Sequence, residues 1–186
     1  GYLGTYATNR FGMGWDTWDM WNHYHICYGL YNWYLVSGEQ RAVDMACRAL
    51  DYMIEYLKEN NNGNYRPTYG WEMNLAISHI FAIMYGVTEN QTYLDVCEHM
   101  LNVDWSTPGG SNWYKDALSG KDFFQSELHR WESLHPIMML STLYEITGNT
   151  EYFKAYERVW KSIQRTDRHN TGAFSSGEGA KGTPYL

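Results

Sequence analysis

One short phrase, which reads as helix, tight turn and helix, limits what this chain can fold into. Its clearest copy is LYEITGNTEYF at residues 143–153. Gly148 suits the left-handed residue that ends many helices, and Asn149 or Thr150 can cap the helix that follows. The phrase therefore predicts two helices joined at a sharp reversal.

Two earlier stretches repeat the phrase, YLVSGEQ at 34–40 and MYGVTENQTYL at 84–94. Aligned on Gly38, Glu89 and Gly148, the copies lie 51 and 59 residues apart, which is room for two helices and two connections in each unit. Repetition at this period is typical of stacked helical hairpins.

Hydrophobic spacing predicts six helices, and each odd-numbered one begins a hairpin. Their approximate ranges are 15–36, 37–59, 71–85, 92–101, 126–147 and 150–165. The odd helices carry Trp, His and Glu residues and would lie inside, whereas the even ones have one charged face and would lie outside. We expect an all-α fold in which residues 1–186 form a single partial domain, half of an (α/α)6 toroid. A free-standing helical solenoid is the structural alternative.

Local signals refine this scheme. Ser37 and Gln40 match a capping box, and Pro136 should kink the fifth helix or mark a broken first turn. Trp160 is expected to face inward on the sixth helix. Residues 102–125 form a connection long enough to predict a functional loop over the mouth of a cavity.

Composition narrows the function classes. Aromatic residues make up 17% of the chain, with 9 Trp and 17 Tyr. They fill a core, or they line a groove suited to sugars, because such rings stack on apolar sugar faces. The formal net charge of −7 comes without a basic patch, which argues against nucleic acid, and no apolar run is long enough to span a membrane. The three cysteines lack metal-ligand spacing and are expected to be structural; they are Cys27, Cys47 and Cys97.

Two regions could carry chemistry. In the first helix, spacings of three and four place His25 on a Trp- and Tyr-rich stripe that begins after Asp16 and Asp19. Near the end of the chain, a Gly- and Ser-rich loop closes on Glu178. A glycosidase needs a carboxylic acid with a raised pKa to protonate the leaving oxygen, and an aromatic, desolvated loop can raise it. An exposed loop carboxylate without chemistry is the alternative.

The motifs resemble those of the glycoside hydrolase family 127 group, the β-L-arabinofuranosidase-like proteins once catalogued as a domain of unknown function. GYLGTY at 1–6 is similar to the family's DGYLGTY phrase, and it is followed by a Trp-rich helix with a His, here His25. The stretch from His129 to His135 ahead of LYEITG resembles the family's His-containing inner helix. TGAFSSGE at 171–178 resembles TGGIGSxxxGE, in which the Glu is the general acid/base.

The resemblance implies a retaining glycosidase acting on arabinofuranosyl or related glycans, with Glu178 as the acid/base. The expected sugar-binding residues are His25, His129 and His135, with Trp15, Trp18 and Trp71 as stacking surfaces. In the family, Glu-x-Cys and a later Cys pair bind zinc and supply the nucleophile. No Glu-x-Cys occurs here, and Asn74 stands near where another His is expected.

We therefore expect an N-terminal portion of a longer enzyme. It would hold no cofactor itself, although the full-length protein is expected to bind zinc. The nucleophile would lie beyond Leu186, and the missing C-terminal half of the polypeptide would be a partner. Alone, the 186 residues should be inactive and should self-associate or be unstable through an apolar seam.

Other readings stay open. In a different α/α-toroid enzyme, such as an unsaturated uronyl hydrolase or a polysaccharide lyase, Asp16 or Asp19 would be the catalytic carboxylate. A non-catalytic carbohydrate-binding or structural half-barrel needs no acid at all. The sequence leaves the compartment open between bacterial periplasmic or secreted and cytoplasmic.

Overall fold

The computed structural model describes residues 1–5, 18–60, 65, 72–103, 113–126, 129–173 and 179. Regular structure in these residues is helical, apart from isolated bridges such as the antiparallel one between His129 and Gly179. The α-helices are α1 (Asp19–Ser37), α2 (Gln40–Asn60), α3 (Glu72–Leu75), α4 (Ile77–Thr88), α5 (Gln91–Asn102), α6 (Trp113–Ser119), α7 (Arg130–Thr147) and α8 (Thr150–Ser162). A 3-10 helix, η3 (Phe123–Ser126), and a π-helical turn, η4 (Ile163–Asp167), complete the set.

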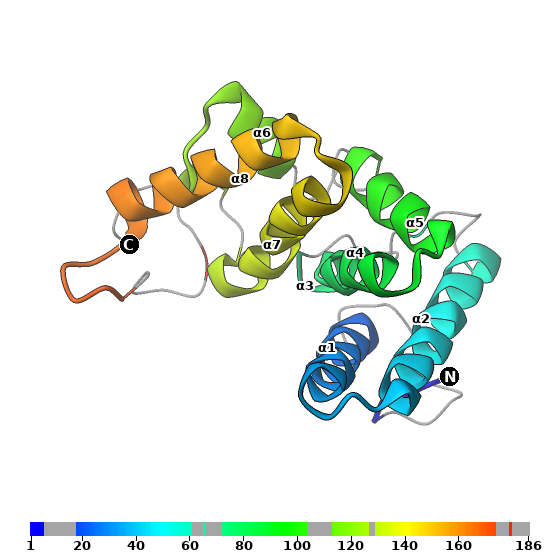
Figure 1. Ribbon diagram of the computed structural model, residues 1–186. Helices are drawn as coiled ribbons and strands as arrows, with labels where there is room; N and C mark the ends of the chain where they lie inside the picture. The colour runs from blue at the N-terminus through cyan, green and yellow to red at the C-terminus, as the bar shows by residue number, and fades with distance from the viewer. Residues whose placement is uncertain are drawn as a thin grey trace.

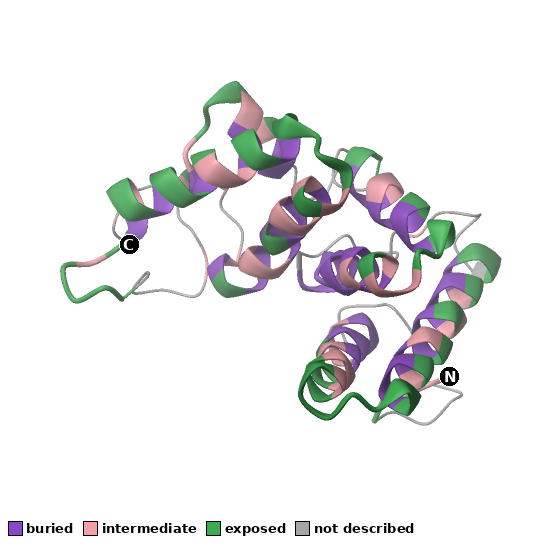
Figure 2. Cartoon of the chain, in the orientation of Figure 1, coloured by how far each residue is buried: buried purple, intermediate pink, exposed green. Residues whose placement is uncertain are grey.

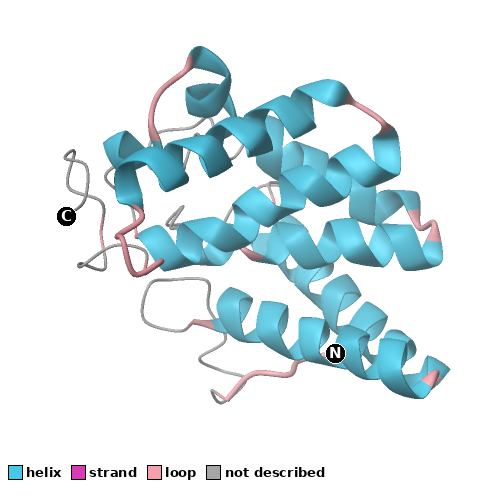
Figure 3. Ribbon diagram, turned by 60° about the vertical axis from the view of Figure 1, so that its left-hand side comes forward, coloured by secondary structure: helices cyan, strands magenta, loops and turns pink. Residues whose placement is uncertain are grey.

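The helices pair into three hairpins, α1–α2, α4–α5 and α7–α8, as Figures 1 and 3 show. The first helices of the hairpins contact one another, α1 against α4 and α4 against α7. The second helices cover them from outside. This arrangement confirms the expected all-α hairpin fold.

Burial differs from one helix to the next (Figure 2). In α2 the buried side chains alternate with an exposed charged stripe, the solvated face predicted from sequence; it comprises Arg41, Asp44, Arg48, Asp51 and Glu55. Helix α4 is different, because every residue from Ile77 to Ala82 is buried. The middle hairpin therefore provides the centre of the core, with neighbours on both sides.

The three turns share the geometry that the repeated phrase predicts. Gly38, Glu89 and Gly148 all have positive φ, between 56° and 72°, and each donates its N–H to the carbonyl of a Tyr four residues back at 2.8 Å. The residue before each of them is Ser or Thr, whose hydroxyl donates to a carbonyl of the last turn at 2.7 Å. Asn90 and Asn149 then cap α5 and α8 through their side-chain oxygens.

Tyrosine hydroxyls tie successive hairpins together in the outer layer. Tyr93 of α5 donates to the Asp51 carboxylate of α2 at 2.8 Å, and Tyr152 of α8 donates to Glu98 of α5 at 3.1 Å. These polar links between the outer helices reinforce the inner contacts.

Several local predictions were wrong. Helix α1 begins at Asp19 rather than Trp15, and Ser37 ends it, so Ser37 cannot be the N-cap of a capping box for α2. Its hydroxyl instead accepts from the Glu39 N–H at 3.1 Å. Trp160 is 53% exposed because it lies on the rim of a cavity between α7 and α8 instead of in the core.

Two further boundaries differ from expectation. Residues 102–125 are not simply a connecting loop, since they contain α6, which packs on α8 by burying Trp113 and Ala117. Pro136 lies within α7 after its first turn, which begins at Arg130. In the part of the chain that is described, no helix has both the length and the apolar character needed to cross a bilayer.

Candidate functional site

Aromatic and imidazole side chains gather where α1, α4 and α7 meet. On α1, Trp21 and His25 are four residues apart and share a helical face with Tyr28. On α7, Trp131 and His135 have the same spacing. We call the set of Trp21, Tyr24, His25, His79, Trp131 and His135 the histidine cluster.

A single hydroxyl joins the three inner helices within this cluster. Tyr24 of α1 is 1% exposed, and its Oη lies 3.0 Å from Nδ1 of His79 on α4 and 2.9 Å from Nδ1 of His135 on α7. The contacts span 55 and 111 residues of sequence. Helix spacing alone could not reveal them.

Four rings form the outer part of the cluster. Trp21 packs edge-on against His25, His135 and Trp131, with ring centroids 4.5, 5.0 and 5.4 Å away. His25 lies 5.4 Å from His135. His25 and Trp131 are exposed, whereas Trp21 and His135 are half-buried. The cluster therefore offers ring faces and imidazole nitrogens at its surface.

The imidazoles of the cluster are neutral at physiological pH. Burial, with the neighbouring His135, lowers the pKa of His79 to about 4, and burial, with the neighbouring His25, lowers the pKa of His135 to about 4. Burial also lowers the pKa of His25 and raises the pKa of the Tyr24 phenol. Neutral imidazole can donate at one nitrogen and accept at the other, which suits hydroxyl ligands more than ionic ones.

His129 occupies a different place from His25 and His135. It is the N-cap residue of α7, with extended backbone, and its backbone pairs with Gly179 in an antiparallel bridge. In sequence, Gly179 directly follows Glu178. The bridge therefore fixes one point of the C-terminal loop at the start of α7.

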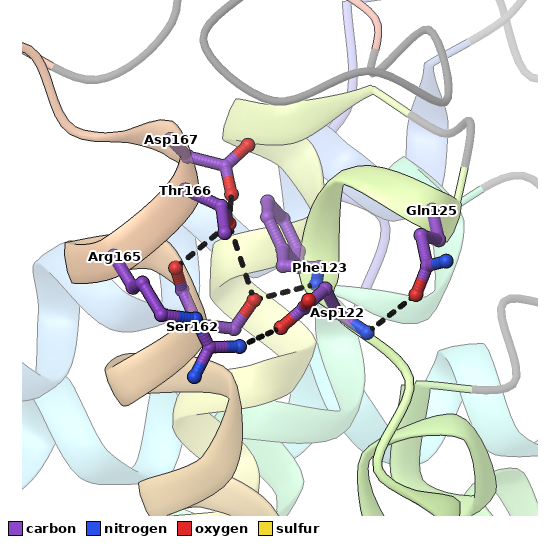
Figure 4. Close-up of polar contacts among 7 residues, drawn as sticks. All are labelled: Asp122, Phe123, Gln125, Ser162, Arg165, Thr166 and Asp167. Atoms are coloured by element: carbon purple, nitrogen blue, oxygen red, sulfur yellow. Dashed lines mark hydrogen bonds and ion pairs between the residues drawn. The ribbon is translucent and has the colours of Figure 1, made fainter.

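The segment that leads into that loop is held by polar contacts among η4, the end of α8 and the residues at the start of η3 (Figure 4). The Phe123 N–H donates to Oγ of Ser162 at 2.8 Å, and Thr166 Oγ1 lies 2.8 Å from both the Ser162 carbonyl and Oδ2 of Asp167. Arg165 also pairs with Asp122.

A buried ion pair completes this anchor. Arg130 at the start of α7 and Asp167 at the end of η4 are both almost fully buried, with Nε and Oδ1 3.4 Å apart. Burial raises the pKa of Asp167 even though Thr166 and Arg130 act to lower it. Taken together, the pair and the bridge hold both ends of the stretch from 168 to 179 against α7.

The other residues predicted for the site lie apart from the histidine cluster or outside the described residues. Trp18 precedes α1 in a left-handed conformation and is 40% exposed. Asp19 is buried and accepts from the Tyr2 hydroxyl at 2.7 Å, which favours a role in holding the N-terminal arm over a catalytic one. Trp15, Asp16, Trp71 and Glu178 lie outside the described residues.

The comparison with protein families matches residues 1–185 to the family described as β-L-arabinofuranosidase, GH127 catalytic domain. The chain belongs to family GH127. This result confirms the resemblance drawn from the GYLGTY and TGAFSSGE motifs. Comparison with curated proteins and with solved structures gave no match.

The zinc-held thiolate that the GH127 resemblance implies does not fit the cysteines of this chain. Cys27, Cys47 and Cys97 are free and lie on three different helices. Burial raises the pKa of Cys27 to about 12 and also raises that of Cys47 and Cys97, whereas a metal-held sulfur is deprotonated. Within the described ranges no three metal-binding side chains gather, so we derive no step through zinc.

Sequence reasoning missed four members of the cluster, namely Trp21, Tyr24, His79 and Trp131, as site residues of this GH127 chain. The i, i+4 pairs Trp21–His25 and Trp131–His135 were a usable signal. His79 lies in an apolar run, where a histidine is usually part of the core. Tyr24 is buried in α1, beneath the more exposed Trp21 and His25. Only the packing of α4 between α1 and α7 brings these side chains together.

Proposed function

We propose that this chain forms part of a glycoside hydrolase acting on arabinofuranosyl or related glycans, with Glu178 as its general acid/base. In this proposal His25, His129 and His135 hydrogen-bond sugar hydroxyls, and Trp15, Trp18 and Trp71 supply stacking surfaces. Three more hairpins would complete an (α/α)6 toroid, and the nucleophile would come from outside residues 1–186.

The observation that carries the proposal is the GH127 catalytic-domain match over residues 1–185. The histidine cluster supports it, because neutral imidazoles beside indole faces suit a sugar, which has both hydroxyls and apolar faces. The bridge between His129 and Gly179 adds support, since Glu178 is covalently bonded to Gly179.

The position of the cluster agrees with a site at the mouth of a funnel. The short turns join first helices to second helices, and the longer connections lead to the opposite end of the hairpins, where α4 and α7 begin. Trp21, Trp131 and His129 lie in the first turn of a helix or just before it. Loops at that end would enclose the sugar and exclude water from the acid, which raises its pKa.

Mutation of Glu178 in the full-length enzyme tests the proposal. Glu178→Gln should lower kcat on alkyl glycosides by about a hundredfold or more, because the leaving group then lacks its acid. Glu55→Gln, on the exposed stripe of α2, is the matched control and should leave turnover unchanged. Unchanged turnover in Glu178→Gln would remove the acid/base role from this residue.

A non-catalytic carbohydrate-binding module is the second candidate. It is favoured by one observation: the exposed side chains of the histidine cluster are rings, and no carboxylate is among them. Titration of tryptophan fluorescence with arabinose-type oligosaccharides, combined with product analysis of the full-length protein, separates the two. Binding without hydrolysis supports the module, and hydrolysis excludes it.

A further inference from the structure

The Tyr24 hydroxyl makes two hydrogen bonds but has one hydrogen to give. Its contacts with Nδ1 of His79 and Nδ1 of His135 are 3.0 and 2.9 Å, both within hydrogen-bonding range. A phenol donates once and accepts through its lone pairs. We infer that Tyr24 is a positioning residue that holds His79 and His135 in opposite tautomers, so that one imidazole carries its proton on Nδ1 and the other on Nε2.

The two alternatives are costly. If both imidazoles carried their proton on Nε2, both Nδ1 atoms would be acceptors, and Tyr24 could satisfy only one of them. If both carried it on Nδ1, the phenol hydrogen would be buried without an acceptor, since the described residues offer Tyr24 no third hydrogen bond. A buried polar group left unpaired costs about 1–3 kcal/mol. The mixed arrangement avoids this cost.

This constraint on the two tautomers, which we call the lock, also determines the character of Nε2, the ring nitrogen that faces away from Tyr24. Nε2 of His135 is buried and has no hydrogen-bond partner among the residues that the structure describes. The ring lies among Trp21, His25 and Trp131, at 5.0, 5.4 and 5.7 Å between centroids. With Nδ1 committed to Tyr24, Nε2 of His135 has a fixed donor or acceptor character.

The ligand class follows from this unpaired atom and rests on the proposed function. A hydroxyl group both donates and accepts, so it can satisfy Nε2 of His135 in either tautomer. The indoles of Trp21 and Trp131, which lie next to each other beside His135, can pack against the apolar face of the same molecule. The site assigned to His135 is therefore a hydroxyl-binding subsite for a sugar such as L-arabinose.

The lock is testable without any ligand or variant. Long-range ¹H–¹⁵N correlation spectra of the full-length protein at pH 7 distinguish protonated from bare ring nitrogens of each histidine. We expect His79 and His135 to show opposite patterns. Two histidines in the same tautomer, or a charged imidazole in either position, would overturn the inference.

Tyr24→Phe removes the hydroxyl and keeps the ring. In this variant we expect at least one of the two tautomer patterns to change. Tyr28→Phe is the matched control, because Tyr28 stacks on Tyr24 at 5.9 Å and lies 5.7 Å from His79 without entering the bridge. If Tyr24→Phe leaves both patterns as they are in the wild type, the hydroxyl does not set them.

Titration with L-arabinose, followed by tryptophan fluorescence, tests the subsite. We expect Tyr24→Phe to weaken binding roughly three- to tenfold, the value of one hydrogen bond, and Tyr28→Phe to leave it unchanged. Equal affinity for L-arabinose in the wild type and in Tyr24→Phe would contradict the hydroxyl-binding subsite at His135. Wild-type protein that binds no sugar would count against the proposed function as well, while the spectra still decide the lock.

Discussion

Residues His79 and His135 are basic groups that the fold keeps uncharged. Each has a pKa lowered to about 4, so both remain neutral well below the pH at which a solvent-exposed histidine takes up a proton. Because an unfolded chain regains the ordinary affinity for protons, folding must become less favourable in acid.

We therefore predict a loss of stability as the pH falls from about 6.5 toward 4. The unfolded state binds protons in this range while the folded state does not, so the contribution is complete above the unfolded pKa and decreases below it. For His79 alone, the free energy of unfolding should fall by about 2 kcal/mol between pH 7.5 and pH 5.

Urea unfolding at the two pH values measures this loss. In His79→Leu the free energy of unfolding should fall less between the two pH values than it does in the wild type. The difference should be about 2 kcal/mol, which is the contribution of His79. An equal pH dependence in both proteins would show that His79 titrates normally in the folded chain.

The Arg130–Asp167 pair gives a second prediction at this scale. Asp167→Ala leaves the Arg130 guanidinium charged and buried, and removing one partner of such a pair costs roughly 3–5 kcal/mol. Asp116→Ala is the control, because its partner Lys121 is 39% exposed, and it should cost less than about 1 kcal/mol. Chemical denaturation compares the two variants, and equal losses would contradict the structural role of the buried pair.

At the scale of the element, the three hairpin turns differ in one informative position. Gly38 and Gly148 occupy the left-handed residue in the first and third turns, whereas Glu89 occupies it in the second with φ of 56°. A residue with a side chain is strained there, and glycine is not. The middle turn is thus the least favourable of the three.

Glu89→Gly should stabilise the chain by about 0.5–1 kcal/mol, since it removes this strain and creates the turn of the other two hairpins. Gly148→Ala is the reverse substitution, since it places a side chain at a left-handed residue, and it should destabilise the folded chain by about 1 kcal/mol. Thermal or urea unfolding would reveal both changes. A destabilising Glu89→Gly would mean that the Glu89 side chain stabilises the turn by more than its backbone strain costs.

The turns also explain why part of the fold was predictable. The left-handed residues at 38, 89 and 148 and the caps Asn90 and Asn149 are local, so sequence spacing predicts them. The Tyr24 bridge and the Arg130–Asp167 pair are not local, since they depend on which helices become neighbours. Helix α6 was missed because its seven residues lie in a Gly-, Ser- and Pro-containing stretch without a clear apolar period.

At the scale of the whole molecule, each hairpin packs on the next, and the first and last have a neighbour on one side among the described residues. Both outer faces carry exposed apolar side chains. On α1 these include Trp33, Leu35 and Val36, and on α7 and α8 they include Met138 and Trp160. An apolar cavity of about 260 Å³ between α7 and α8 is lined by Leu134, Ile137, Met138, Tyr156, Val159, Trp160 and Ile163.

We predict that the 186-residue chain self-associates through these faces. Trp160→Lys, which places a charge at the cavity, should shift sedimentation velocity profiles toward the monomer. Val103→Lys is the control, because the exposed fraction of Val103 is comparable, 43% against 53% for Trp160, but Val103 lies at the end of α5 in the middle hairpin. A wild-type chain that sediments as a monomer and melts cooperatively would contradict the prediction.

The placement of the turns has a consequence for how such a protein can change over time. Tight reversals occupy one end of the hairpins, where backbone geometry leaves few acceptable residues. The longer connections join each second helix to the next first helix, and those first helices begin at the end where the histidine cluster lies. Insertions and substitutions can accumulate there without altering helix packing, because loops tolerate changes in length. New ligand preferences can therefore evolve at one end while the architecture at the other end stays constant.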